Sequence, residues 1–205
     1  AEVSIAGKVM LNGEMRTDIQ YYHRIVVVAL VSTPFPIPLG LRFQKNGEGE
    51  IACALSHRNI YQAMIDNSWK HVLVFEDDVV PDANNTSLFP ETLKELPPDW
   101  ELFYLGYLKN EKRSFGKKLQ QFWYRTMAIF GFSNMPAHML KNRLPKEFSP
   151  HLFKAGFHDC THAYALSLSA AKKLAGAQTP VVQRADNLLS ALVLKGELNA
   201  FASRS

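Results

Sequence analysis

The most constraining feature of this sequence is a short apolar run that ends abruptly in three acidic residues. Residues 71–75 read HVLVF, and Glu76, Asp77 and Asp78 follow directly. A continuous apolar run of this length is typical of a strand that is covered on both faces in a parallel sheet. Ligands of open α/β sheets usually bind beyond the ends of such strands, so the three carboxylates predict a binding site at that edge.

Strand patterns and helix patterns alternate along the chain. Strands are expected at residues 25–31, 71–75, 101–105 and 162–166, and helices at 51–67, 88–96, 117–130, 170–176 and 186–196. We expect Gly106 to end its strand, Ser169 to cap the helix that follows it, and Asp186 to begin the last helix. This alternation predicts the α/β fold class, with a Rossmann-type, mainly parallel sheet flanked by helices.

The composition is that of one globular domain over residues 1–205. The chain has 47% hydrophobic and 20% charged residues, which excludes a disordered chain, and two cysteines are too few for a disulfide scaffold. Cys53 and Cys160 have no metal-ligand spacing and are expected to be buried thiols. Prolines interrupt the longest uncharged stretch, residues 25–41, and no signal-peptide pattern opens the chain. Neither a membrane-spanning helix nor a secretory leader is therefore expected.

The excess positive charge lies in one segment. The formal charge is +4, and residues 109–118 hold five basic residues and one acidic residue. A solvated loop is the usual interpretation of such a run. Aromatic residues accompany it, so a second interpretation is contact with an acidic acceptor or an anionic membrane surface through Arg113, Lys117 and Lys118. No nucleic-acid-binding motif accompanies the run, so nucleic acid is not an expected partner.

Glu76 and Asp78 have the spacing of a cation site. In an extended segment, residues two apart project to the same side, while Asp77 faces away. Clustered carboxylates repel one another unless a hard cation such as Mg²⁺ or Mn²⁺ neutralises them, and that cation could hold a diphosphate. The alternative is an acidic turn in which Asp78 or Asp82 caps a helix.

Four segments of the chain carry a more specific pattern. They are GEIACALSH at 49–57, HVLVFEDDVV at 71–80, DWELFYLG at 99–106 and THAYALSLSAAKKL at 161–174. Together they resemble glycosyltransferase family 25, which includes bacterial lipooligosaccharide galactosyltransferases and collagen galactosyltransferases. The resemblance covers residues 48–205, whereas residues 1–47 lack the strand motif with which the family usually begins and are a diverged part of the domain.

The resemblance implies a GT-A-like fold that binds a UDP-sugar, usually UDP-galactose, together with Mn²⁺ or Mg²⁺. It makes Asp78 the direct metal ligand and Glu76 a contact to the donor's ribose or to the metal, while Asp77 could exchange roles with either. His162, and His158 before it, could supply a late metal or diphosphate contact, although such histidines more often satisfy a local hydrogen bond.

Ser56 and His57, which end the first of the four segments, have two interpretations. Ser56 and His57 lie near the nucleotide or the sugar in the family picture. The structural alternative is that their side chains tie the helix to the neighbouring strand by buried hydrogen bonds.

Asp186 is the candidate general base. If transfer inverts the anomeric carbon, one carboxylate is enough to take the proton from the acceptor hydroxyl. The competing interpretation is that Asp186 is simply the N-cap of the helix NLLSALVL. Asp159 is a weaker alternative for the base.

The sequence therefore leads to a metal-dependent hexosyltransferase acting on a bacterial lipooligosaccharide or lipopolysaccharide acceptor. The resemblance implies a cytoplasmic location, peripheral at the inner membrane. A catalytically degenerate relative that binds glycans or nucleotide sugars is the alternative. A Mg²⁺-dependent phosphotransferase or hydrolase is a third possibility that the same carboxylates allow.

Overall fold

The computed structural model describes residues 10–11, 14–15, 26–29, 48–76, 79, 88–108, 114–133, 135–181 and 183–204, with side chains from Cys53 onward. Asp77, Asp78, Asp82 and Arg113, to which the sequence assigned roles, lie outside these described residues.

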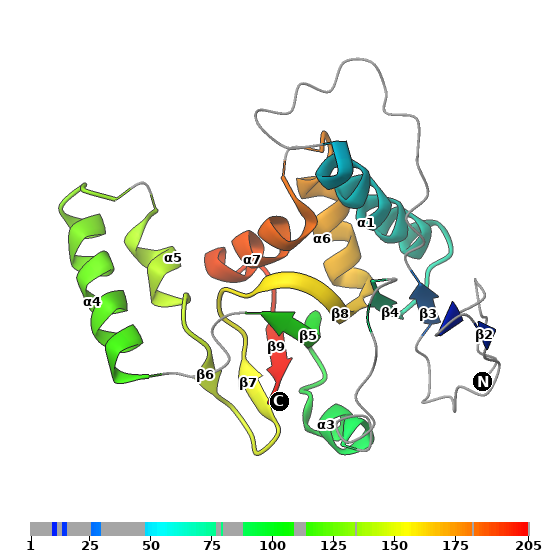
Figure 1. Cartoon of the computed structure of the whole chain (residues 1–205), viewed down its shortest axis with the longest axis horizontal. Coiled ribbons are helices and arrows are strands. Elements are labelled where there is room, and N and C mark those ends of the chain that lie inside the picture. The colour runs from blue at the N-terminus through cyan, green and yellow to red at the C-terminus, as the bar shows by residue number, and fades with distance from the viewer. Residues whose placement is uncertain are drawn as a thin grey trace.

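A seven-stranded sheet with the order β3-β4-β8-β5-β9-β7-β6 forms the centre of the molecule (Figure 1). Its strands are β3 (Val26–Ala29), β4 (His71–Phe75), β5 (Leu102–Leu108), β6 (Lys146–Glu147), β7 (Leu152–Lys154), β8 (Asp159–Ser167) and β9 (Ala200–Ser203). A separate two-stranded sheet pairs β1 (Met10–Leu11) with β2 (Glu14–Met15). Strands at all four expected places are confirmed, and the α/β class with them.

The expectation of a mainly parallel sheet is wrong. Among the described strands, only the β3–β4 and β5–β9 pairs are parallel. The long strand β8 lies antiparallel between β4 and β5. A continuous apolar run indicates that a strand is covered on both faces, but it carries no information about the direction of that strand.

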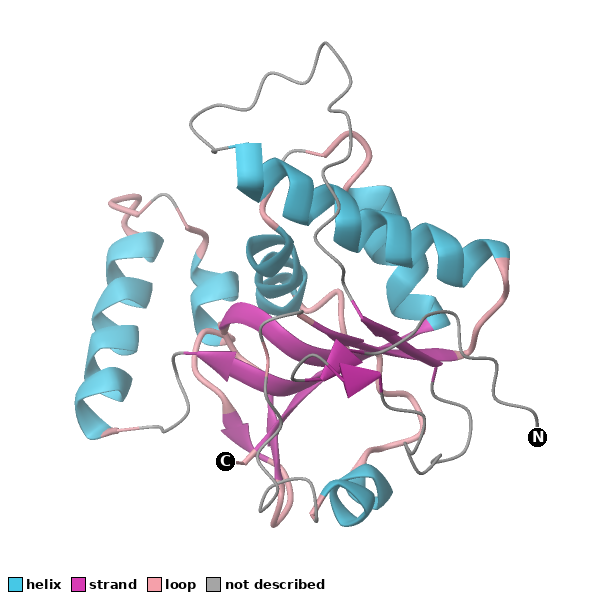
Figure 2. Cartoon of the chain, turned by 45° about the vertical axis from the view of Figure 1, so that its right-hand side comes forward, coloured by secondary structure: helices cyan, strands magenta, loops and turns pink. Residues whose placement is uncertain are grey.

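Helices cover both faces of the sheet (Figure 2). On one face lie α1 (Glu48–Asp66), α6 (Leu168–Ala177) and α7 (Ala185–Lys195), and on the other lies α3 (Phe89–Glu95). Because side chains alternate along a strand, Val72 and Val74 pack with the first group of helices, and Leu73 packs with α3. The strand β4 is therefore buried on both faces, as the apolar run at 71–75 predicted.

The helices α4 (Phe115–Ile129) and α5 (Ala137–Lys141) pack on each other beside the sheet and form a projection from the body (Figure 1). The buried side-chain amide of Gln121 on α4 donates to the backbone oxygen of Leu140 on α5 at 2.5 Å. Ser114 caps α4 by accepting a hydrogen bond from the backbone N–H of Lys117. The helix expected at 117–130 is thus confirmed, two residues longer at its start.

Three expected element ends differ from the structure. Gly106 lies inside β5, at a bulge where the register against β8 shifts. A Cβ at this position would approach the Cβ of His162 to 3.3 Å, so there is little room for a side chain. Ser167 rather than Ser169 caps α6, since its side chain accepts from the N–H of Ala170. The last helix begins at Ala185 and has Arg184 at its N-cap position.

The two cysteines are not the buried thiols expected from the sequence. Cys53 is exposed and Cys160 is partly exposed. Both lie near Glu76, at the end of β4 and outside the packed layers of the core. Among the described helices, none is both long enough and apolar enough to cross a lipid bilayer.

Candidate active site

Glu76 is held at the end of β4 by the neighbouring strand β8. Its backbone N–H donates to the carbonyl oxygen of His162 at 3.0 Å. Its carboxylate accepts a hydrogen bond from the hydroxyl of Thr161 at 2.7 Å, and Nδ1 of His162 lies 3.0 Å from its other oxygen. The antiparallel pairing of β4 with β8 places these three residues side by side. The Glu76 carboxylate is therefore fixed in orientation before any ligand binds.

His57 presents a neutral imidazole to this site from the middle of α1. The residue is fully buried, and burial lowers its pKa to about 4. Its Nδ1 lies 2.5 Å from the hydroxyl of Tyr164 on β8. Its Nε2 has no hydrogen-bond partner among the described residues. The expected tie between this helix and a strand is confirmed for His57, and one ring nitrogen is left available to a ligand.

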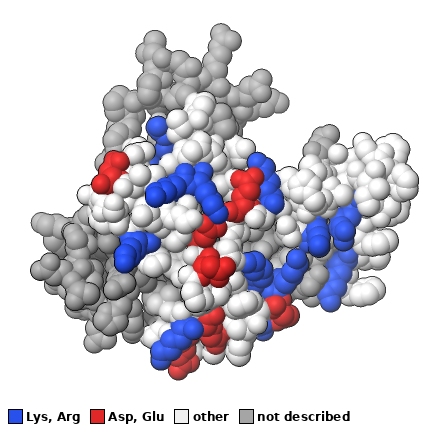
Figure 3. Space-filling model, turned by 180° about the vertical axis from the view of Figure 1, so that it is seen from behind, with Lys and Arg blue, Asp and Glu red and all other residues white. Residues whose placement is uncertain are grey.

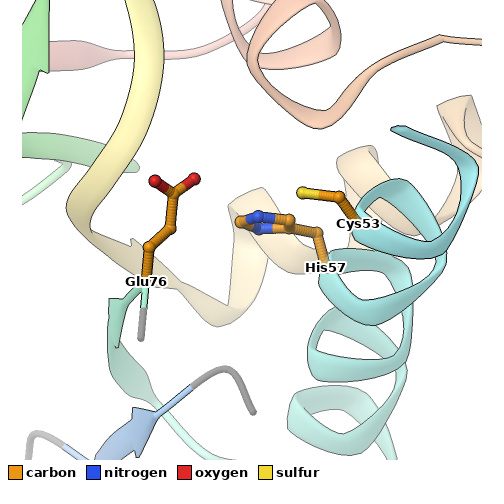
Figure 4. A group of neighbouring side chains, drawn as sticks. All are labelled: Cys53, His57 and Glu76. Carbon is orange, nitrogen blue, oxygen red and sulfur yellow. The ribbon is translucent and has the colours of Figure 1, made fainter. Parts of the chain in front are cut away.

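Cys53, His57 and Glu76 point toward one another across the gap between α1 and the end of β4 (Figure 4). One ligand atom from each lies within 4.8 Å of the others, so the three could hold a single metal ion. A thiol, an imidazole and a carboxylate form a softer donor set than the carboxylates predicted from the sequence. Cys53 and His57 are four residues apart on a helix and so share one face, a spacing that sequence reasoning could have used.

Asp186 lies in the first turn of α7 with its side chain 10% exposed. The interpretation of Asp186 as the N-cap is wrong, because Arg184 occupies that position and Asp186 is the second residue of the helix. Its carboxylate accepts from the N–H of Asn187 at 2.8 Å and lies 3.4 Å from the Arg184 guanidinium. Asp186 therefore satisfies one of the free N–H groups in the first turn of α7, although it is not the N-cap residue.

Cys160 lies at the point where the acidic residues converge. Burial raises the pKa of its thiol, and the charges of Asp186, Asp159 and Glu76 raise it further. Its backbone adopts φ +64°, a conformation that costs a non-glycine residue roughly 1–3 kcal/mol and that clusters at functional sites. The structure therefore brings Glu76, at the end of β4, and Asp186, on α7, into one region, although they are 110 positions apart in the sequence.

The other residues predicted from the sequence lie in different parts of the fold. His158 is buried, where its Nε2 accepts from the N–H of Gly156 and its ring packs 4.2 Å from that of Tyr107, so it holds structure rather than facing a ligand. Ser56 is partly exposed on α1, and Asp159 begins β8. Lys117 and Lys118 lie in the first turn of α4, on the projection.

The comparisons with known proteins identify the family. The sequence pattern described as "Glycosyltransferase family 25 (LPS biosynthesis protein)" matches residues 43–189. This chain belongs to glycosyltransferase family 25. The expectation drawn from the four motifs is confirmed.

Individual relatives of the family are more distant and much longer. The chain is 28% identical over 134 residues to the cattle protein "Probable inactive glycosyltransferase 25 family member 3" and 29% identical over 136 residues to the human "Inactive glycosyltransferase 25 family member 3". It is 29% identical over 132 residues to the mouse "Procollagen galactosyltransferase 2". These alignments cover 63–64% of this chain and 17–18% of each relative, so the chain spans less than a fifth of the length of the curated relatives it matches.

The family motifs meet in the structure. The segment GEIACALSH lies in α1 and supplies Cys53 and His57, and HVLVFE ends in Glu76. The segment THAYALS lies in β8 and supplies the two partners of the Glu76 carboxylate. Residues that are far apart in the sequence therefore build one site.

A separate surface cavity of about 330 Å³ lies among Glu101, Lys154 and Lys173 and shares no residue with this site. Its charged groups pair with one another or with neighbouring polar atoms. Lys173 lies 2.7 Å from Glu101, and the Lys154 ammonium contacts the side chain of Asn199. This cavity is a structural feature rather than a second candidate for catalysis.

Proposed function

We propose that this chain forms the donor site of a metal-dependent glycosyltransferase that moves a hexose, galactose in the first instance, from a UDP-sugar to a saccharide acceptor. The observation that carries the proposal is the convergence of three family motifs on the oriented carboxylate of Glu76. Family membership supports a sugar donor and a glycan acceptor. A lipooligosaccharide or lipopolysaccharide acceptor at the cytoplasmic face of an inner membrane is the finer form of the proposal.

Glu76 and His57 fit the divalent metal that the family resemblance implies, whereas the Cys53 thiol is a softer donor than Mn²⁺ or Mg²⁺ prefers. The buried Nε2 of His57 has no partner among the described residues, and a carboxylate oxygen of Glu76 lies within reach of the same point. The His57 imidazole and the Glu76 carboxylate would hold the metal together with Asp78. His162 would orient Glu76 through the contact between its Nδ1 and the Glu76 carboxylate. When bound, Mn²⁺ or Mg²⁺ supplies Lewis-acid neutralisation of the diphosphate leaving group.

Asp186 is the proposed general base. Its carboxylate lies in the first turn of α7, 3.4 Å from the Arg184 guanidinium. An ionised carboxylate can accept the proton of the acceptor hydroxyl as that oxygen attacks the anomeric carbon and the bond to UDP breaks. One base of this kind is sufficient for an inverting transfer. The low exposure of the Asp186 side chain limits competition from bulk water.

A catalytically degenerate protein that binds a nucleotide sugar is the second candidate. It is favoured by the similarity to the cattle and human proteins named glycosyltransferase 25 family member 3, whose names describe them as probably inactive and inactive. The two candidates share the binding site and differ only in turnover, so a single preparation separates them.

The test measures UDP release and UDP binding with purified protein, Mn²⁺ and UDP-galactose. The enzyme proposal expects UDP release above background that Glu76→Gln and Asp78→Ala abolish, while Glu91→Gln, an exposed acid on α3, leaves it unchanged. UDP binding that depends on Asp78 but gives no release, with or without glycan acceptors, supports the degenerate binder. If the protein neither binds UDP nor releases it from UDP-galactose, both candidates are overturned. Phosphate release from simple phosphoesters would indicate a hydrolase instead.

A further inference from the structure

The helix α4 turns its apolar face away from the protein. Six large apolar side chains along one side of the helix and at its C-cap are between 57% and 82% exposed. They are Phe115, Leu119, Phe122, Trp123, Ile129 and Phe130, which we call the α4 stripe. Their spacing of three, four and seven residues places them on one face. Exposed apolar surface of this size normally marks an interaction site.

The opposite face of α4 is polar and packs inward. Gln121 is the buried residue of this helix and donates to the carbonyl oxygens of Leu140 and Lys141 at the end of α5. The ring of Tyr124 lies 5.2 Å below the guanidinium carbon of Arg143. A surface helix of a globular protein normally shows the reverse arrangement, with its apolar face against the core. The arrangement in α4 therefore needs something outside the described residues to cover the stripe.

The segment around the stripe is strongly cationic. Between residues 112 and 146 the sequence contains eight basic residues and no Asp or Glu. These residues are Lys112, Arg113, Lys117, Lys118, Arg125, Lys141, Arg143 and Lys146. In Figure 3 the α4–α5 projection carries Lys and Arg side chains on the part nearer the body, its outer end is uncharged, and no Asp or Glu is seen on it in this view. The partner that covers the stripe must therefore be apolar in its interior and negatively charged at its surface.

Charge decides between the two simplest partners. A second copy of this chain, docked through α4, would bring two such cationic segments together, and like charges facing one another disfavour the complex. A bilayer that contains anionic lipids offers both an acyl region for the stripe and phosphate groups for the basic residues. An indole such as that of Trp123 is suited to the boundary between these two regions.

We propose that α4 lies in the interface of an anionic lipid bilayer, with the α4 stripe inserted among the lipids and Lys118 and Arg125, on its border, against their headgroup phosphates. The helix lies on the membrane rather than across it, since it has only 15 residues. This inference does not depend on the proposed catalytic activity. It assigns Lys117 and Lys118, the last two residues of the basic run, to a helix whose apolar face, and not charge alone, provides the contact.

The experiment measures partitioning of the purified chain between buffer and vesicles. We expect binding to vesicles of phosphatidylcholine with phosphatidylglycerol, and at least roughly 10-fold weaker binding to phosphatidylcholine alone or at high salt. The double variant Phe122→Ser and Trp123→Ser should lose binding to anionic vesicles, and Lys118→Gln with Arg125→Gln should weaken it. The matched controls are Leu88→Ser, at the exposed N-cap position of α3, and Lys94→Gln, in the last turn of that helix. Both should bind vesicles as the parent chain does.

A second readout guards against variants that fail to fold. Trp123 fluorescence should shift to shorter wavelength when anionic vesicles are added, and Trp123→Phe should remove that shift while the circular dichroism spectrum stays unchanged. Equal binding by the parent chain and the stripe variant would overturn the proposal. So would a dimer, seen by sedimentation velocity without lipid, that the stripe variant dissociates, because the stripe would then be covered by a second copy.

Discussion

The hydroxyl of Thr161 donates a hydrogen bond to a carboxylate oxygen of Glu76 across 2.7 Å, although the two residues are 85 positions apart in the sequence. Thr161 is buried in β8, whereas Glu76 is partly exposed at the end of β4. The other carboxylate oxygen of Glu76 lies 3.0 Å from Nδ1 of His162, so both oxygens have a partner on β8. Thr161 is therefore a positioning residue for Glu76.

Replacing Thr161 by valine should weaken metal binding by roughly tenfold or more, because partners that orient a ligand carboxylate have effects of that size. Calorimetric titration with Mn²⁺ in the presence of UDP measures the affinity. Thr126→Val, on α4, is the matched control and should bind Mn²⁺ like the parent chain. An unchanged Mn²⁺ affinity in Thr161→Val, with native stability in urea, would contradict the positioning role.

Asp186→Asn should lower the transfer rate by about 10²–10⁴-fold, the usual contribution of a positioned base. The amide cannot accept the proton, but it preserves the shape of the side chain, so UDP binding should stay unchanged. Because Asp186 is not the N-cap of α7, the free energy of unfolding of the Asp186→Asn variant should fall by well under the ~1 kcal/mol of a lost cap.

Asp159→Asn serves as the comparison for Asp186, since Asp159 is the weaker candidate in the same region. We expect it to keep most of the turnover. If the loss of turnover occurs with Asp159→Asn and not with Asp186→Asn, the role of base moves to Asp159.

Gly156→Ala should destabilise the fold by about 1–3 kcal/mol, as expected for an added methyl group in a packed region. A Cβ at this position would lie 2.6 Å from the carbonyl oxygen of Arg143 and 2.8 Å from the nitrogen of Pro145, and backbone atoms cannot move aside cheaply. Urea unfolding measures the effect. Gly176→Ala, where a Cβ in α6 meets nothing within 4 Å, should instead be neutral or stabilise by roughly 0.5–1 kcal/mol.

Glu95 should make stability depend on pH in the acid range. Hydrogen bonds from Ser149 and His151 lower the pKa of Glu95 from 4.5 to about 2. The unfolded chain therefore binds the proton at higher pH than the folded chain does. The stabilisation that Glu95 provides is complete above pH 4.5 and is lost as the pH falls toward 2.

Urea unfolding of Glu95→Gln between pH 7 and pH 2 tests this sign. The variant should be less stable at pH 7 and should show a smaller loss of stability between pH 4.5 and 2 than the parent chain. Glu91→Gln, an exposed acid on the same helix, should keep the slope of the parent. An identical slope in Glu95→Gln would contradict the assignment.

Local patterns were sufficient to predict most of the elements. The apolar run at 71–75 is the strand β4 with the same limits, and the helix expected at 51–67 is α1, which ends at Asp66. Periodicity and chain-terminating residues act over a few neighbours, so the sequence itself contains them. Element ends were less certain, since Ser167 and Ser169 are equally good caps in the sequence and only the path of β8 selects the first.

The site was predictable in part. The carboxylate at the end of β4 and the histidine of α1 were expected from the motifs, and the structure brings them together. Thr161, Tyr164 and the two cysteines were missed as members of the site. Their roles depend on β8 lying antiparallel beside β4, and nothing in the residues 159–167 indicates that direction.

The sequence by itself determined which segments are strands and helices, which family the chain belongs to, and that an acidic cluster follows a buried strand, because each of these depends on residue types at short spacing. The tertiary structure alone decided the direction of β8, the partners of Glu76, and the outward orientation of the α4 stripe. The sequence predicts a helix over residues 117–130, but which of its faces meets the protein depends on contacts such as that of Gln121 with α5. Such contacts join residues across the fold, and the energy of packing, not the local pattern, selects them.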